Sequence, residues 1–407
     1  MSEASPAATD PAATRARLGE ARRLVVKLGT HVVTHHGREF ALGRVFALVE
    51  SLAKLRRAGF DVILVSSGAV GLGRRALGLS DTPLSLGLRQ ACAATGQGRL
   101  IALYTQAFAQ LGVEAAQVLL TQADLADPDR ALCLRTTLLR LLELGAVPIL
   151  NENDSVSVRE LLEYRASVDP GTAGDPGPRA ASFGDNDGLS ARVAVAIDAD
   201  LLLLLTDVDG LFTANPQVDP SAQRIPELAH IDAQTLARAA GGSAGGTGGM
   251  RSKLEAAKLA GEAGVDVLIL DGRSERLIER ALAGEDMGTF IPSAERRSPR
   301  RRRIALTPRC DGALILNPGA VAALIERKAS LLPIGVSAVE GNFGVGGLIE
   351  LRDASGLVRG RGLVNYDSDA CRALAGHHSR EITRILGWRG YDALVTRDNL
   401  VLGEVDP

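Results

Sequence analysis

The sequence predicts an α/β fold, with a mostly parallel sheet covered by helices on both faces and a small β-rich domain after it. Short apolar runs alternate with segments of helical apolar spacing from Arg23 onward, which is typical of strand–helix repeats. Aromatic residues make up only 3% of the chain although 46% is hydrophobic, which favours helices on a parallel sheet over an aromatic-rich sandwich. A change in composition near residue 300 marks the second domain.

The expected elements of the first domain follow from the periodicity of apolar residues. The predicted strands are Leu24–Val26, Val62–Val65, Gln117–Leu119, Val147–Leu150, Leu201–Leu205 and Val267–Leu270. The predicted helices are 43–58, 86–111, 130–144, 187–198 and 251–263. The unbroken apolar run Leu201–Leu205 indicates a strand that is buried on both faces.

At ~150 residues per domain, a chain of 407 residues holds two or three domains. We predict a disordered lead-in at 1–21, without the apolar core of a signal peptide, and a first domain at 22–291. Within it, glycines and prolines at 159–182 indicate a mobile insertion. A basic linker at 292–304 leads to the second domain at 305–390 and a tail at 391–407. The second domain's expected strands are Ala313–Leu316, Gly347–Leu351 and Leu357–Leu363, with helices at 319–328 and 368–386.

Composition and motifs exclude several classes of function. The net charge of −2 gives no global positive field for nucleic acid or membranes, and no apolar run reaches the ~18 residues of a membrane span. The four cysteines form no C-x-x-C pair, which fits a reducing cytoplasm. The chain lacks a P-loop and the H-E-x-x-H motif, and its histidines lack ligand spacing, so we name no metal ligand.

One glycine motif keeps a dinucleotide-binding oxidoreductase open as an alternative. Gly71, Gly73 and Ala76 form a G-x-G-x-x-A after a predicted strand. Such a site also needs an acidic residue ~20 positions further on, and Asp81 is too close whereas Glu114 is too far.

Two glycine-containing loops are candidates for binding phosphates. Lys27 and Gly29 end the first predicted strand, and the run Gly241–Gly249 leads through Met250 into a helix with Lys253 in its first turn. Free backbone N–H groups and a helix N-terminus favour anions. Lysine is rare here, with five examples among 46 basic residues, and two of the five stand in these loops. A compact ammonium differs from the arginine fork beside a phosphoryl group, which supports a role for both lysines.

Three polar clusters at strand ends are candidates for binding a small substrate. They are Ser66–Gly68, Asn151–Asp154 and Gly184–Asp187. Serine at a helix start suits a carboxylate or phosphate, and short amides and carboxylates suit an ammonium group or, together with phosphates, Mg²⁺. Turn chemistry alone also favours these residue types, so each cluster by itself permits a purely structural role.

In this order, the loops resemble those of the amino-acid kinase family, and within it the kinases that act on glutamate. The matching strings are VVKLGT (25–30), SSGAVGLG (66–73), QACAATGQGRL (90–100), NENDSVSV (151–158), FGDNDGLSA (183–191), LLLLTDVDGLFTANP (202–216) and GTGGMRSKLEAA (246–257). The resemblance implies a three-layer α/β/α sandwich that transfers the γ-phosphate of ATP, with Mg²⁺, to the side-chain carboxylate of L-glutamate. The product, glutamyl 5-phosphate, enters proline biosynthesis. A sister kinase acting on acetylglutamate or aspartate remains the alternative.

The resemblance also implies a role for each matching residue. Lys27 and Lys253 would neutralise the migrating charge, and Asp187 would orient both lysines. The implied nucleotide contacts, besides these lysines, are Thr206, Asp207, Thr247, Gly248, Gly249, Met250, Arg251 and Ser252. The implied glutamate contacts are Ser67, Asp154 and Asn186, with Asn151 and Asp185 close by.

The second domain resembles a PUA domain. Such domains bind RNA elsewhere, but a short basic run such as Arg300–Arg303 is more often a solvated charge run, so we expect no RNA binding and keep an RNA-binding regulator as an alternative. The resemblance implies a homo-oligomer and feedback inhibition by L-proline, with Glu160 at a proline-sensitivity position. Two departures from the family are the long stretch Arg159–Ser182 and Arg89, which replaces a common lysine.

Overall fold

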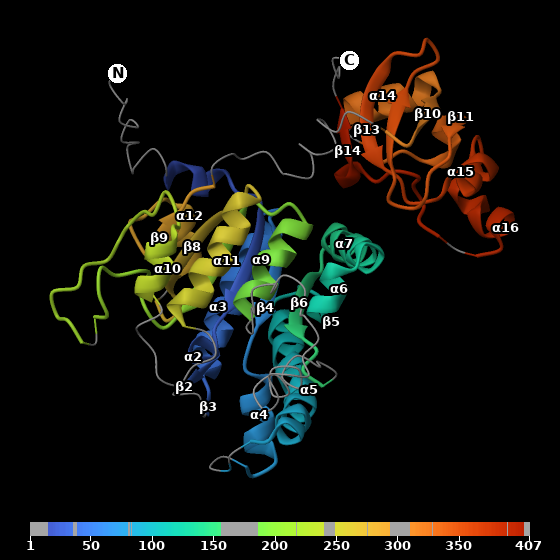
Figure 1. The fold of residues 1–407 in the computed structure, drawn as a ribbon. Helices are drawn as coiled ribbons and strands as arrows, with labels where there is room; N and C mark the ends of the chain where they lie inside the picture. The colour runs from blue at the N-terminus through green and yellow to red at the C-terminus, as the bar shows by residue number, and fades with distance from the viewer. Residues whose placement is uncertain are drawn as a thin grey trace, which may run out of the picture. The chain divides into compact units, whose positions relative to one another are not determined.

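The structure, a computed structural model, describes residues 15–35, 39–79, 82, 84–155, 186–216, 218–239, 249–274, 276–293, 310–327, 329–388 and 390–402. The chain divides into two compact units, Met1–Arg296 and Arg297–Pro407 (Figure 1). The predicted insertion at 159–182 and most of the predicted linker lie outside the described residues. No described helix is long and apolar enough to cross a membrane.

The first unit is built on a seven-stranded sheet. Its strands, in spatial order, are β5 (Ala115–Leu120), β6 (Val147–Glu152), β4 (Asp61–Ser66), β1 (Arg23–Leu28), β7 (Leu201–Thr206), β8 (Asp266–Asp271) and β9 (Thr289–Ile291). Neighbouring strands are parallel except β9, which runs antiparallel to β8 at the edge. The predicted parallel sheet is confirmed, and all six residues of β7 are buried, as its apolar run predicts.

Helices cover both faces of this sheet (Figure 1). One face packs against α3 (Leu42–Arg57), α5 (Leu86–Gln110) and α12 (Leu277–Leu282). The other packs against α7 (Pro128–Glu143), α9 (Asn186–Ala196) and α11 (Met250–Glu262). Because successive side chains of a strand point to opposite faces, Leu24 and Val26 of β1 enter the first core and Val25 the second. Lys27 therefore points to the face that carries α9 and α11.

Shorter elements complete the unit. They are η1 (Arg17–Glu20), α2 (Thr30–Val33), β2 (Thr34–His35), β3 (Glu39–Phe40), α4 (Ala69–Ala76), α6 (Gln122–Ala126) and α10 (Ala233–Ala239).

Gly73 of the dinucleotide-like motif serves helix packing. Gly71 and Gly73 lie inside α4 and not in the strand–helix turn that a dinucleotide site requires. A Cβ on Gly73 would lie 1.8 Å from the carbonyl oxygen of Cys92, and one on Gly96 would lie 1.8 Å from that of Ala69. Only glycine permits this approach of α4 to α5, so the oxidoreductase alternative is wrong.

The predicted disordered lead-in at 1–21 is wrong for residues 15–21. Leu18 is buried in the core, and Arg17 forms a 2.8 Å ion pair with Asp266 at the start of β8. The sequence did not indicate these contacts, because the partners of Arg15 and Arg17 lie more than 200 residues away in the chain. Residues 1–14 lie outside the described part.

The second unit holds a five-stranded sheet in the order β11 (Val336–Gly341), β10 (Gly312–Leu316), β12 (Leu348–Arg352), β13 (Val358–Leu363) and β14 (Leu400–Leu402). The three predicted strands and the first predicted helix, α14 (Pro318–Arg327), are confirmed. The remaining short elements are η2 (Pro333–Gly335), η3 (Ser379–Glu381) and η4 (Arg397–Asn399).

Two predictions for this unit are wrong. The expected helix at 368–386 is divided into α15 (Ser368–Leu374) and α16 (Ile382–Leu386), since Gly376 takes the left-handed conformation at φ +79° between them. The domain also continues beyond residue 390, because β14 pairs with β13 and Leu394 and Val395 are buried in the core. The predicted tail therefore belongs to the sheet as far as Leu402.

Candidate active site

The strongest feature of the site is a buried carboxylate held between two ammonium groups. Asp187 is fully buried, with Lys27 Nζ 2.6 Å from Oδ1 and Lys253 Nζ 3.1 Å from Oδ2. Ser252 Oγ donates a 3.0 Å hydrogen bond to Oδ2. The lysines are only 2% and 4% exposed, so water screens these charges little. The fold thus brings two lysines that lie far apart in the sequence to the same carboxylate.

Three elements bring these side chains together. Lys27 lies near the end of β1, Asp187 in the first turn of α9, and Lys253 in the first turn of α11. A Cβ on Gly29 would lie 3.8 Å from Lys27 Nζ and 3.1 Å from the carbonyl oxygen of Leu205. Glycine at position 29 thus keeps the backbone close to β7 beside the ammonium group.

Opposing effects act on the pKa of Asp187. Burial raises it, but the charges of Lys27 and Lys253 and their hydrogen bonds lower it further, so the pKa lies well below its ordinary value. Asp187 is therefore ionised throughout the neutral range. The ionised carboxylate fixes the direction of both lysine side chains.

A second cluster joins the predicted substrate residues. The amide nitrogen of Asn186 donates to Ser67 Oγ at 2.9 Å, to the Ser66 carbonyl at 3.2 Å and to Asn151 Oδ1 at 2.9 Å. Ser67 follows β4, and Gly68 takes φ +108° to turn the chain into α4. Since Asn186 and Asp187 are adjacent in α9, the two clusters lie side by side at the carboxyl ends of the strands, where such sheets bind ligands.

One acceptor in this cluster has no hydrogen-bond partner among the residues that the structure describes. Oδ1 of Asn186 is buried and finds no hydrogen-bond donor within the described ranges. A buried polar atom is costly unless it is paired, so this oxygen is a position for a donor from a ligand.

Sequence reasoning missed the residues behind this cluster. Gln97 of α5 accepts a 2.7 Å hydrogen bond from the amide nitrogen of Asn151, which fixes the direction of that amide. Tyr104, also on α5, is fully buried with its hydroxyl 2.8 Å from Ser66 Oγ, and burial raises its pKa. Both stand in a regular helical pattern, and no local signal in one sequence distinguishes them from packing residues.

The structure describes some of the remaining predicted site residues and not others. Thr206 ends β7 and its hydroxyl donates to Asp207 Oδ1 at 3.2 Å. Gly249 precedes α11, where no side chain among the described residues caps the helix. Met250 is half-buried, and Arg251 pairs with Glu255 one turn further along α11. Asp154 lies in the turn after β6. The predicted residues Thr247, Gly248, Asp185 and Glu160 lie outside the described residues.

Comparison with known proteins identifies the family. Residues 22–271 match the sequence model of the amino acid kinase family, which is more than half of the chain, and residues 312–386 match that of the PUA domain. The chain belongs to the amino acid kinase family.

Several relatives of this amino acid kinase are similar over almost their whole length. A glutamate 5-kinase of Moorella thermoacetica is 43% identical over 390 residues, which cover 95% of this chain and 98% of that protein. A glutamate 5-kinase of Gloeobacter violaceus is 46% identical over 383 residues, covering 93% and 98%. A third, from Trichlorobacter lovleyi, is 42% identical over 391 residues, covering 95% and 98%. These matches include both units, so the order of a kinase domain and a PUA domain is common to them.

Proposed function

We propose that this kinase transfers the γ-phosphate of ATP to the side-chain carboxylate of L-glutamate. The product is L-glutamyl 5-phosphate, and the reaction is the first step of proline biosynthesis. The observation that carries the chemistry is the convergence of Lys27 and Lys253 on the buried carboxylate of Asp187. The identity of the acceptor is supported by the relatives, which are glutamate 5-kinases at 42–46% identity.

The charged cluster suits phosphoryl transfer. Negative charge spreads over the oxygens of the transferred group, and catalysis depends on positioning and on electrostatic stabilisation. In the proposal, Lys27 and Lys253 contact the phosphate oxygens while Asp187 holds both ammonium groups in place. The attacking carboxylate is already ionised at neutral pH, so the reaction needs no general base.

The amide cluster suits the acceptor. Ser67 and Asn186 present a hydroxyl and an amide beside the charged cluster, and the unpaired Oδ1 of Asn186 suits an ammonium donor such as the α-amino group of glutamate. We propose that Asn151 supports Asn186 from behind and that Asp154 and Asp185 complete the substrate side.

The described residues also fit a bound nucleotide. The uncapped start of α11 and the two ammonium groups suit a triphosphate. No group of three or more acidic, histidine or cysteine side chains lies together within the described parts of the chain, and Asp187 is already engaged by both lysines. We therefore propose that Mg²⁺ binds chiefly through phosphate oxygens and water, where it would neutralise phosphate charge.

A coupled assay of ADP release tests this function. We expect turnover that depends on L-glutamate and falls by about a thousandfold in Lys253→Ala, because a charge at the transferred group is lost. Lys258→Ala is the matched control, since Lys258 lies on the same helix, is exposed and pairs only weakly with Glu262 at 3.9 Å. Turnover with acetylglutamate or aspartate and none with glutamate would instead assign the chain to a sister activity.

The family resemblance also supports feedback inhibition by L-proline, assembly as a homo-oligomer and action in the cytoplasm. The four cysteines are free, which is compatible with a reducing compartment. Repeating the ADP assay with added L-proline, in the wild type and in Glu160→Ala, tests the regulatory part of the proposal. Sedimentation of the full chain tests its assembly.

A further inference from the structure

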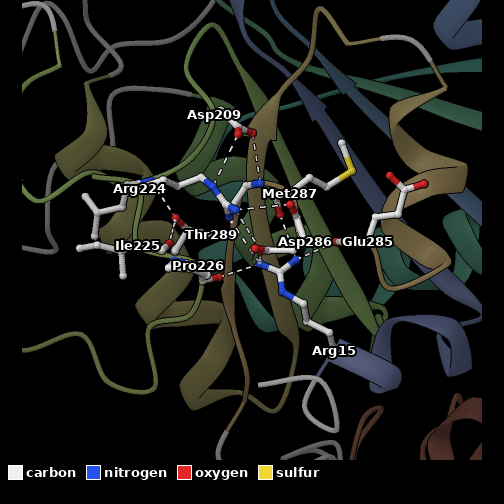
Figure 2. Close-up of polar contacts among 11 residues, drawn as sticks. Arg15, Asp209, Arg224, Ile225, Pro226, Glu285, Asp286, Met287 and Thr289 are labelled. Atoms are coloured by element: carbon white, nitrogen blue, oxygen red, sulfur yellow. Dashed lines mark hydrogen bonds and ion pairs between the residues drawn. The ribbon is translucent and has the colours of Figure 1, made fainter. Parts of the chain in front are cut away.

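Arg15 anchors the start of the described chain to a distant part of the kinase unit. Its side chain is only 5% exposed. Its guanidinium donates to the carbonyl oxygens of Glu285 and Met287 at 3.0 Å and of Pro226 at 2.7 Å, and lies 3.2 Å from the carboxylate of Asp286 (Figure 2). One side chain thus joins the segment before β9 to residue 226, which lies in the long connection after β7.

Arg224 strengthens the same junction from within that connection. Its guanidinium donates to the carbonyl oxygen of Gly288 and lies 3.0 Å from the carboxylate of Asp286. It also lies 3.7 Å from Asp209, whose other oxygen accepts a 3.1 Å hydrogen bond from the Gly288 amide. Figure 2 shows Arg15 and Arg224 approaching Asp286 from two sides.

We call residues 207–228 the β7 loop; residue 217 within it is outside the described part. Both ends of this loop are fixed to the start of β9. The Thr289 hydroxyl accepts a hydrogen bond from the Leu211 amide at 2.8 Å and donates one to the Ile225 carbonyl at 2.6 Å. A Cβ on Gly210, which has φ +94°, would lie 2.5 Å from that hydroxyl.

The β7 loop begins at the predicted nucleotide contacts. Asp207 follows directly after Thr206, and Asp209, held by Gly288 and Arg224, is only two residues further on. Gly288 itself lies against the carboxyl end of β8, because a Cβ there would lie 2.2 Å from the Ile269 carbonyl oxygen. A shift of this junction would therefore move the backbone of Asp207.

From this geometry we infer that Arg15 and Arg224 are positioning residues of the nucleotide site, which they serve by fixing the β7 loop against the start of β9. The inference rests on the proposed function, in which Thr206 and Asp207 contact ATP. It assigns to Arg15 and Arg224, which lie outside the predicted nucleotide contacts, an effect on nucleotide affinity and none on the acceptor.

The test compares two arginines of the same segment. Arg15→Met removes the contacts of Arg15 with Pro226 and Asp286. Arg17→Met removes an ion pair with Asp266, which lies at the amino end of β8, away from the predicted nucleotide contacts. In Arg15→Met we expect the KM for ATP to rise about tenfold, which corresponds to ~1.4 kcal/mol of nucleotide affinity, with an unchanged KM for glutamate. In Arg17→Met we expect the melting temperature to fall while both KM values stay within about twofold of the wild type.

Two further measurements separate the possible outcomes. The double variant Arg15→Met/Arg224→Met should raise the KM for ATP by less than the product of the single effects, because both residues share Asp286. Calorimetry with MgADP measures the affinity for nucleotide in the absence of an acceptor. If the wild type shows no glutamate-dependent turnover, the proposed function is refuted. The affinity of the variants for MgADP can still be compared in that case. Equal effects of Arg15→Met and Arg17→Met on ADP affinity, or an effect of Arg15→Met on stability alone, would overturn the inference. If Arg15→Met does not fold, Arg15→Gln is measured against the same criteria.

Discussion

Buried ion pairs lie at both ends of helix α9, and they differ in their partners. At the first turn, Asp187 is shared by two lysines from β1 and α11. Two residues beyond the last turn, Asp198 forms a 2.8 Å pair with Arg135 of α7, whose side chain is 1% exposed. Arg135 also donates to the carbonyl oxygen of Ala196 at the end of the helix. Asp187 is fully buried and Asp198 is 12% exposed, and the first site lies where the strands end in the predicted binding loops.

The difference shows how position separates function from structure. Arg135 pairs with Asp198 and interacts favourably with the helix C-terminus. Two cations on one carboxylate at the other end are harder to explain by stability, because desolvating each ion costs several kcal/mol. Both lysines lie beside Asn186 and the other proposed substrate contacts.

Asp187→Asn should produce the largest effect. The change removes the carboxylate that both lysines contact, so we expect kcat to fall by about a thousandfold. We also expect the free energy of unfolding to fall by about 3–5 kcal/mol. Steady-state ADP release and urea denaturation measure the two effects. Activity within tenfold of the wild type would contradict the assigned role of Asp187.

Asn186→Ala should come next and should act on the acceptor alone. The variant loses the hydrogen bonds to Ser67 and Asn151, so we expect the KM for glutamate to rise about tenfold to a hundredfold, at ~1–3 kcal/mol for an unsatisfied polar site. The KM for ATP should stay unchanged. Ser190 is buried one turn later in α9, so Ser190→Ala controls for a loss of stability. Equal KM values for glutamate in the two variants would contradict a contact between Asn186 and glutamate.

Asp198→Asn tests the other end of the helix. Removing the partner of buried Arg135 should lower the free energy of unfolding by about 3 kcal/mol. We expect kcat and both KM values to be retained at temperatures where the variant is folded. A fall in kcat similar to that of Asp187→Asn would remove the contrast between the two ends.

Ser355→Ala should have the smallest effect and extends the comparison to a half-buried carboxylate of the second unit. Hydrogen bonds, first from the Ser355 hydroxyl and then from Arg359, lower the pKa of Asp353 to about 2. The stabilisation is therefore present above the ordinary pKa of 3.8 and is lost as the pH falls from there towards 2. Carbon NMR should show the pKa of Asp353 rising towards its ordinary value in the variant, and an unchanged pKa would contradict the hydrogen-bond explanation.

The sheet could be predicted because its signals are local, whereas the place of Asp187 between the two lysines was implied by the family resemblance alone. Each strand of the parallel sheet is a short apolar run, and alternation along β1 determines which face Lys27 occupies. The scarcity of lysine drew attention to Lys27 and Lys253 without knowledge of Asp187's position.

What could not be predicted depends on distant partners. Arg15 resembles any arginine in a polar lead-in until Pro226 and Asp286 are placed beside it. The contact of Gln97 could not be predicted either, since its partner Asn151 lies on another element. The strand β14 is only three residues long, and its strand conformation depends on its antiparallel pairing with β13.

The tight crossing of α4 and α5 constrains how the acceptor site moves. With Gly73 and Gly96 each set against the other helix's backbone, the two helices have no room to slide and behave as one rigid body. Ser67, which precedes α4, and Gln97 on α5 must then move together. We therefore expect any displacement of α4 to change the positions of Ser67 and Gln97 together.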